Sequence, residues 1–487
     1  MSDKAYKGPL EQIDQCVWRI PRDYKHGMRV DGLIYADAQM IDQLKSDQAP
    51  EQVANVACLP GIQVASLAMP DIHWGYGFCI GGVCATDPAE GGVVSPGGVG
   101  YDINCGVRLM RSNLTLEDVQ PRLEKLIDQL FAHIPSGVGR GGRHRFDHRQ
   151  LRQLMDQGPA ALSARGLVTR RDLEFTEAQG RMEGSDPEAV SPRALERGQE
   201  QCGTLGSGNH FLEVQVVDQV VDPQAAAHLG LYEGGVCVTI HSGSRGLGYQ
   251  VCDDSLRAMR TVPGRYGIDL PDRQLACAPV HSPEGQAYLG AMRAAANYAW
   301  CNRQILMWQA REVFELVFGR GWEQMDMELI YDVAHNIAKI EDHQIEGQVR
   351  RVCVHRKGAT RAFAAGHPEL PAAYRSLGQP VIIPGDMGRA SWVLIGQPGS
   401  MHHTFGTTCH GAGRAMSRTE AVRQAGDRRI DRELAARGIV ARSASRRGLA
   451  EEQPAAYKDV DLVVDVVQRC GLSAKVARLR PIGVIKG

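Results

Sequence analysis

The segment Asp102-Ile-Asn-Cys105 places a carboxylate and a thiol three positions apart in a glycine-rich stretch that can turn sharply. Both side chains could therefore face one metal ion. Thiolate, carboxylate and imidazole suit a borderline divalent ion, and three histidines at predicted strand or turn boundaries could complete the set: His210, His241 and His335. A thiolate can also bridge two ions in a site for phosphoryl transfer. Each histidine alone is more often structural, so the prediction depends on the whole set.

A second candidate site is the segment Cys409-His410-Gly-Ala-Gly413-Arg414. We expect a helix to follow it, so that backbone amides and the positive helix end could hold a phosphate beside His410. His410 could then act as a general base or attack phosphorus itself, and the residues alone leave both roles open. Alternatively, His410 could be a structural histidine in a glycine-rich turn, without a role in catalysis.

Further polar residues could bind a nucleotide or a polyanion. Asn209 and Glu213 flank His210, and Glu213 could either accept from a base or ribose, or orient His210 from behind. Five cations suit phosphates, although surface ion pairs would explain them equally well: Arg245, Arg356, Lys357, Arg361 and Arg414. The glycine-rich stretches do not fit the Walker pattern or the dinucleotide-binding fingerprint, which disfavours ordinary P-loop chemistry.

Four short β-branched runs each lead into a polar turn that carries ionisable side chains: residues 236–240, 329–333, 352–354 and 381–383. Enzymes often place their chemistry at such strand ends, so we expect the four to converge on one site. Helices are predicted after Thr115 and from Pro283 to about Phe318, where Gly319 follows. Residues 135–203 are polar and charged, which indicates an irregular insertion with some helix.

The end of the chain has two features of its own. Residues 414–447 are rich in arginine, which is as consistent with a solvated helix face as with a phosphate-binding face. The apolar run 476–485 suggests that the C-terminal segment docks, which would give Lys486 a fixed position.

Composition excludes several classes of protein. The 487 residues carry 55 Lys and Arg against 56 Asp and Glu, so no overall charge attracts a nucleic acid or a membrane. No stretch is long and apolar enough for a membrane helix, and the start lacks the apolar part of a signal peptide, which favours a soluble, cytoplasmic protein. The 13 cysteines form no C-x-x-C pair, which is typical of reduced thiols.

At these residues the sequence resembles the RtcB family of GTP-dependent RNA ligases, from about Trp18 to Gly487 and least in the insertion. The resemblance is carried by an ordered series of motifs: M-P-D-I-H-W-G-Y-G-F, G-Y-D-I-N-C-G-V-R, G-S-G-N-H-F-L-E, H-S-G-S-R-G-L-G, D-V-A-H-N-I-A-K, V-H-R-K-G-A-T-R-A, C-H-G-A-G-R and the ending R-P-I-G-V-I-K-G. It implies an α+β fold with mixed sheets and flanking helices, in one catalytic domain over residues 1–487.

The resemblance also implies a site with two Mn²⁺ ions, bridged by Cys105. His210 and His241 would bind one ion, and Asp102 and His335 the other. The family's guanylylated histidine falls on His410. Its guanylate pocket falls on Asn209, Glu213, Asn336, Pro384, Gly385, Asp386, Met387, Ser391, Gly411, Ala412, Gly413, Tyr457 and Lys486. RNA phosphates are expected at Arg245, Arg356, Lys357 and Arg414.

The implied activity joins an RNA 3′-phosphate or 2′,3′-cyclic phosphate to a 5′-hydroxyl, in tRNA splicing or RNA repair. A cyclic end is opened, His410 takes GMP from GTP, GMP passes to the 3′-phosphate, and the 5′-hydroxyl displaces it. An archease-type activator and a monomeric or homodimeric state are expected. The alternative is a metal-dependent nucleotidyltransferase or phosphoesterase that caps or trims ends without ligation, and an RNA-binding protein without catalysis is a third class.

Two departures from the family pattern concern the pocket. Where G-S-M-G-T-A-S-Y-V-L is expected, the chain has Asp386, Arg389 and Trp392, which adds an anion and a cation beside the predicted nucleotide. Nucleotide preference is therefore less firmly implied than the metal ligands. Cys79 stands where proline is common, and we expect a structural role for it.

Overall fold

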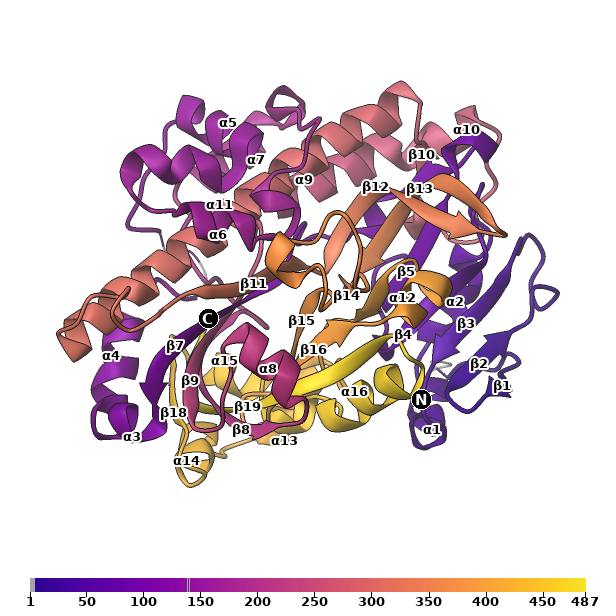
Figure 1. Cartoon of the computed structure of the whole chain (residues 1–487). Helices are drawn as coiled ribbons and strands as arrows, with labels where there is room; N and C mark the ends of the chain where they lie inside the picture. Colours follow the sequence, from indigo (N-terminus) through magenta and orange to yellow (C-terminus); the bar gives the residue numbers. More distant parts are fainter. Residues whose placement is uncertain (1–4, 138, 140) are drawn as a thin grey trace.

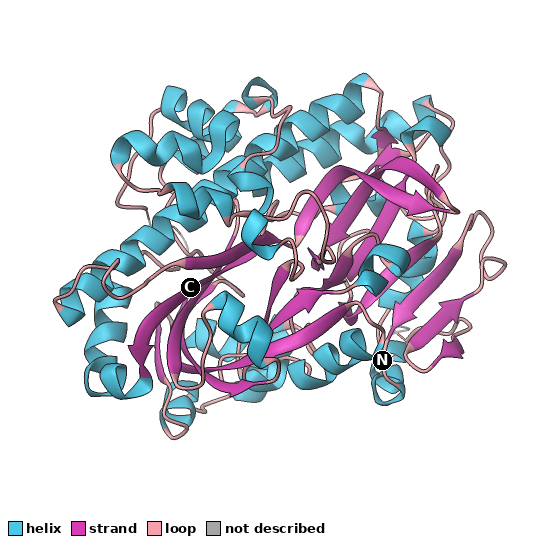
Figure 2. Cartoon of the chain, in the orientation of Figure 1, coloured by secondary structure: helices cyan, strands magenta, loops and turns pink. Residues whose placement is uncertain are grey.

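The computed structural model describes residues 5–137, 139 and 141–487. Two large sheets carry most of the strands, and helices flank them (Figures 1 and 2). Both sheets combine antiparallel pairs with one parallel pair, β18 with β19 in one and β3 with β4 in the other. The predicted α+β class with mixed sheets and flanking helices is confirmed.

The larger sheet has eight strands. Its order is β11 (Leu329–Ala334), β7 (Gly106–Thr115), β9 (Gly235–Ser242), β8 (Phe211–Val220), β19 (Ser473–Lys486), β16 (Ser391–Gly396) and β15 (Pro380–Pro384), with β18 (Val440–Ser443) also on β19. β19 thus pairs with three strands, β8, β16 and β18. The predicted docking of the C-terminal segment is confirmed.

The second of the two large sheets has seven strands. Its order is β1 (Glu11–Asp14), β2 (Val17–Ile20), β3 (Asp31–Tyr35), β4 (Ala65–His73), β5 (Ile80–Thr86), β13 (Gln348–Lys357) and β12 (Asn336–Ile345). β11 ends at Ala334 and β12 begins at Asn336, so the single residue His335 joins the two sheets. Two small pairs complete the strands: β6 (Val93–Val94) with β10 (Ala278–Pro279), and β14 (Ala359–Arg361) with β17 (Thr407–Cys409).

The long predicted helix is α11 (Pro283–Phe318). The Ser282 side chain accepts from the Gly285 amide at its start, and Gly319 ends it with a left-handed backbone at φ 67°. The helix predicted after Thr115 has the expected capping box with Asp118. A short 3₁₀ helix at Gln120–Arg122, where Pro121 lacks an N–H, divides it into α3 (Leu116–Val119) and α4 (Leu123–His133).

The predicted insertion, in its described part, contains three helices: α5 (His148–Gln157), α6 (Arg170–Glu174) and α7 (Pro192–Gln199). Figure 1 shows α5 and α7 close to α11. Leu151, Leu154 and Leu195 share a buried cluster there with Met292 and Trp300 of α11. Burial of such side chains is worth about 1.5 to 3 kcal/mol each, so the polar insertion still has an apolar base that fixes it on α11.

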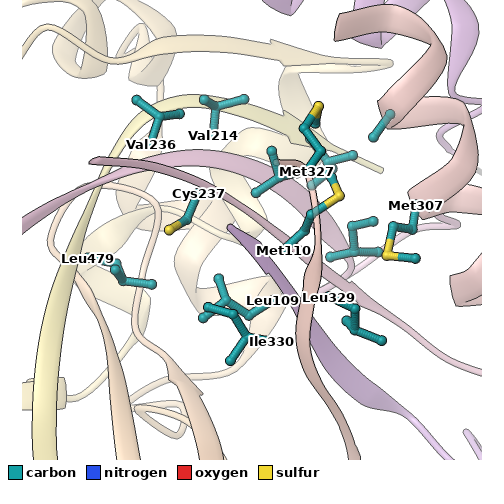
Figure 3. Packing of buried hydrophobic residues seen from close by; sticks show 14 of the residues in the cluster. Leu109, Met110, Val214, Val236, Cys237, Met307, Met327, Leu329, Ile330 and Leu479 are labelled. Carbon is teal, nitrogen blue, oxygen red and sulfur yellow. The ribbon is translucent and has the colours of Figure 1, made fainter. Parts of the chain in front are cut away.

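The core of the larger sheet is shown in Figure 3, where Leu109 and Met110 of β7 lie among Leu329 and Ile330 of the paired strand β11. All 13 cysteines are free, and only Cys470 is not fully buried. Within the described residues, no helix has both the length and the apolar character needed to cross a membrane.

Candidate active site

The predicted site residues converge on a cavity of about 500 Å³. Its walls come from the ends of both large sheets and from the turn after β17. Five sequence-predicted metal ligands line it together with His410: Asp102, Cys105, His210, His241 and His335. The expected convergence of strand ends is confirmed for the turns after β9, β11 and β15. The turn after β13 contributes only Gly358 to the lining.

Two groups of ligand atoms share the Cys105 thiol. Cys105, His241 and His335 form one group, and Asp102, Cys105 and His210 form the other, with all ligand atoms in a group within 4.8 Å of each other. His210 Nε2 lies 2.8 Å from the Asp102 carboxylate, and His241 Nε2 lies 3.3 Å from His335 Nε2. This grouping differs from the implied distribution, because His210 faces the Asp102 turn while His335 lies against His241.

The chemistry of these donors fits divalent ions. Burial, with His210 and His410 nearby, lowers the pKa of His241 well below its usual value, and burial does the same for His335, so both rings are neutral. Burial opposes ionisation of Asp102, but His210 outweighs it and lowers the Asp102 pKa to about 2. Burial raises the Cys105 pKa, so a bound cation would be needed to stabilise its thiolate.

Hydrogen bonds with backbone carbonyls orient these ligands. The Leu205 carbonyl lies 2.9 Å from His210 Nδ1, which leaves Nε2 for the ligand group. Glu213 does not contact His210, so its alternative role behind that ring is wrong. The Arg303 guanidinium of α11 donates to the carbonyls of Asn104 and Ser242 at 2.7 and 2.9 Å. It thereby ties the Asp102–Cys105 turn to the end of β9, a role that the sequence did not reveal.

Buried Asp71 holds His410. Its carboxylate oxygen Oδ2 lies 2.5 Å from His410 Nδ1 and accepts from the backbone amides of His410 and Gly411 at 2.9 and 3.3 Å. Because Nδ1 is occupied, Nε2 is the nitrogen left for chemistry. Asp71 lies in the first family motif but had no predicted role. The signal available was a carboxylate two positions from His73, at the end of a strand that leads into a glycine-rich loop.

The helix expected directly after the His410 turn is absent. The chain continues irregularly to α13 (Arg418–Ala425), which Ser417 caps, so a helix end does not lie beside His410. Gly413 is required for a different reason: at φ 71°, a Cβ would meet the Asp71 carbonyl oxygen at 2.2 Å. The turn therefore packs against the Asp71 segment instead of starting a helix.

The predicted guanylate pocket divides into two sets. One set lines the cavity: Asn209, Asn336, Pro384, Gly385, Gly411, Ala412, Gly413 and Tyr457. The other set is buried but does not line it: Glu213, Asp386, Met387, Ser391 and Lys486. Hydrogen bonds connect the two sets, because the Asn209 side-chain oxygen accepts from Tyr457 at 3.0 Å and from Lys486 at 3.3 Å.

Two buried carboxyls in the second set are perturbed. Burial raises the pKa of Glu213 to about 7, and Gln215 donates to it at 2.8 Å while also reaching Ser391 at 2.9 Å. Burial raises the pKa of Asp386 to about 6. Asp386 lies 3.3 Å from Arg389 Nε, so the two unusual charges of this chain pair with each other outside the cavity lining.

The predicted phosphate contacts also divide. Arg245 and Arg414 line the cavity, together with two arginines that were not singled out as phosphate contacts, Arg197 and Arg418. Arg356 is wrong as a contact, because it is fully buried and both its terminal nitrogens bind Glu341. Lys357 is wrong too, since it is buried and its ammonium binds backbone carbonyls.

Five of the ten arginines in residues 414–447 form surface ion pairs. Arg423 pairs with Glu420, Arg428 with Glu433, and Arg429 with Asp431. The solvated interpretation therefore holds for these, whereas Arg414 and Arg418 share Glu452 at the cavity.

Known proteins resemble the chain along nearly all of its length. A family model described as tRNA-splicing ligase RtcB matches residues 52–487. A tRNA-splicing ligase RtcB from Thermococcus kodakarensis is 56% identical over 98% of this chain and 99% of its own length. One from Archaeoglobus fulgidus is 54% identical over 99% of both chains, and an RNA-splicing ligase RtcB from Mycobacterium tuberculosis is 56% identical over 90% of this chain and its own full length. This chain belongs to the RtcB family.

Proposed function

We propose that this protein is a GTP- and Mn²⁺-dependent RNA ligase that joins 3′-phosphate or 2′,3′-cyclic phosphate ends to 5′-hydroxyl ends through guanylylated His410. The observation that carries the proposal is the placement of His410 in one cavity with both ligand groups, its Nδ1 bound to Asp71 at 2.5 Å. A phosphoesterase that only trims ends would need the metal ligands but no histidine held as a covalent carrier.

Asp102, Cys105, His210, His241 and His335 would hold two divalent ions. Bound there, the ions supply positive charge that binds phosphate oxygens and offsets the charge developing at phosphorus. The sulfur, nitrogen and oxygen donors would suit zinc as well, so the preference for manganese comes from the family.

His410 would act through Nε2. That nitrogen attacks the α-phosphorus of GTP, a nitrogen–phosphorus bond forms, and the bond to the bridging oxygen breaks as pyrophosphate leaves. Asp71 binds Nδ1 and stabilises the positive charge that the ring gains during attack. An oxygen of the RNA 3′-phosphate then attacks the same phosphorus and releases His410. The 5′-hydroxyl oxygen finally attacks the RNA phosphate and expels GMP.

The guanylate would lie between Tyr457 and the buried polar residues at the end of β19. Lys486 and Glu213 are held there, because β19 pairs with β8 in a register that sets Val484 against Glu213 and Lys486 against Phe211. Asn209, which both Tyr457 and Lys486 contact, links this pocket to His210. RNA phosphates would bind the cavity arginines, and Arg197 and Arg245 have no carboxylate within 4.0 Å among the described residues. An archease-type activator and a monomeric or dimeric state remain predictions.

Incubation with Mn²⁺ and α-³²P-labelled GTP, followed by a denaturing gel, tests the covalent step. We expect acid-labile label on the wild type and none on His410→Ala, with His403→Ala as the control because that histidine is exposed outside the cavity. Labelled wild type should then join a 3′-phosphate RNA to a 5′-hydroxyl RNA. Trimmed ends without label on the protein would favour the phosphoesterase instead.

A further inference from the structure

The loop between β4 and β5 exposes a tryptophan directly after His73, which lines the active-site cavity. Among the six tryptophans, all of them described, Trp74 alone is exposed, with 55% of its surface accessible. In the described part of the chain its indole has no stacking or cation–π contact with another residue. Tryptophan is enriched at binding surfaces, where a partner covers its ring.

Buried glutamines hold the backbone on either side of this indole. Gln52 binds Gly75 twice, accepting from its amide at 3.0 Å and donating to its carbonyl at 2.6 Å. Gln274 accepts from the Gly77 amide at 2.9 Å, and a Cβ at Gly77 would meet the Gln274 carbonyl oxygen at 2.5 Å. The Trp74 amide itself donates to Asp47 at 3.0 Å.

Two buried lysines bind the carbonyls of the same loop. Lys458 donates to the Ile72 carbonyl at 2.5 Å, and Lys357 donates to the Tyr76 and Phe78 carbonyls at 2.5 and 3.1 Å. Neither lysine has a carboxylate within 4.0 Å in the described residues, and burial lowers the pKa of each to about 8. Hydrogen bonds from two buried ammonium groups therefore add to those of the glutamines in holding the backbone of this segment.

The loop is also continuous with the catalytic residues. His73 precedes Trp74 directly and lines the cavity, and Asp71, two residues earlier, holds His410. Neighbouring Cα atoms are about 3.8 Å apart, so the Trp74 backbone directly adjoins the cavity wall at His73. A loop backbone that is already held in place loses little conformational entropy when a flat ligand stacks on its side chain.

We propose that Trp74 is a stacking platform for a nucleobase of the RNA strand whose end lies in the cavity; this rests on the proposed RNA ligase function. Aromatic side chains bind single-stranded RNA by stacking with every type of base, which suits a ligase that joins ends of differing sequence. An RNA base is favoured over a protein partner because His73, next to Trp74, belongs to the wall of the site where the RNA ends would react.

The test compares Trp74→Ala, Trp74→Phe and the control Tyr266→Ala, which removes an aromatic ring of 44% exposure outside the cavity. Fluorescence anisotropy with a single-stranded RNA bearing a 3′-phosphate measures affinity. We expect Trp74→Ala to bind about 5- to 100-fold more weakly, and the other two variants to stay near the wild type. All three should take up GMP from GTP at the wild-type rate, because Trp74 does not line the cavity.

A scan with 2-aminopurine along the RNA locates the base. Quenching at one position in the wild type should disappear in Trp74→Ala. Unchanged RNA affinity and unchanged quenching in Trp74→Ala would overturn the proposal. Loss of GMP uptake in both Trp74 variants would also overturn it, because the ring would then have a structural role. Loss of stimulation by a protein activator, with RNA binding intact, would assign the indole to that partner instead. If the wild type takes up no GMP but RNA affinity still depends on Trp74, the ligase function fails and the platform stands.

Discussion

At the level of single residues, we expect the proposed reactivity of His410 to depend on Asp71, which binds its Nδ1. Asp71→Asn keeps the size of the side chain but removes the charge that stabilises the imidazolium formed during attack. We expect GMP uptake to slow by about 10² to 10⁴-fold, with Mn²⁺ binding retained because Asp71 is outside both ligand groups. Single-turnover labelling measures the rate. Asp87→Asn, a buried carboxylate that does not line the cavity, is the control. A wild-type rate in Asp71→Asn would exclude this role.

Glu213 should make the stability of the protein depend on pH. Burial raises its pKa from 4.5 to about 7, so between these values the folded state binds a proton that the unfolded state has released. The free energy of unfolding contributed by this group therefore falls as pH rises from 4.5 to 7, by on the order of 3 kcal/mol, and is constant above 7.

Glu213→Gln cannot titrate and should lose this contribution. Urea unfolding of both proteins at pH 5 and pH 8 measures it: the difference between the two pH values should be smaller in the variant. Glu233→Gln, at an exposed site, should behave like the wild type. Equal pH dependence in wild type and Glu213→Gln would show that Glu213 has an ordinary pKa in the folded protein.

At the level of elements, α11 fixes the metal-ligand turn as well as the core. Arg303 is fully buried, pairs with Asp332 at 2.8 Å and donates to the carbonyl beside Cys105. Arg303→Met would leave Asp332 with Arg108 as its one remaining ionic partner among the described residues. We expect a loss of about 3 to 5 kcal/mol in unfolding free energy and weaker Mn²⁺ binding.

The same helix provides a matched control for this change. Arg293 makes one side-chain hydrogen bond in the described part of the chain, to the Gly184 carbonyl at 3.3 Å, so Arg293→Met should change stability by about 1 kcal/mol or less. Urea unfolding and calorimetric Mn²⁺ titration of both variants compare the two arginines. If Arg303→Met matches Arg293→Met in both measurements, the network around Asp332 does not support the site.

At the level of the whole molecule, local patterns predicted elements better than partners. The caps at Thr115 and Ser282, and the β-branched runs that became β9, β11, β13 and β15, are local signals and were found. The buried pairing of Arg356 with Glu341, 15 residues away and on the paired strand β12, depends on register and could not be read from the sequence. The same is true of Asp71 and His410, which are separated by 339 residues.

The proposed metal ligands come from positions 102 to 335, and His335 joins the two large sheets. Bound ions would therefore connect both sheets, and unfolding would have to release them. At a free Mn²⁺ concentration 100 times the Kd, mass action adds about 2.7 kcal/mol to the free energy of unfolding per site.

We expect Mn²⁺ to raise the thermal midpoint and chelation to reverse the rise. Cys105→Ala should abolish the rise, because both ligand groups share that thiol. Cys353→Ala removes a buried thiol outside both groups and should keep the rise even if its own midpoint is lower. An equal Mn²⁺-induced rise in the two variants, measured by calorimetry, would place the ion elsewhere.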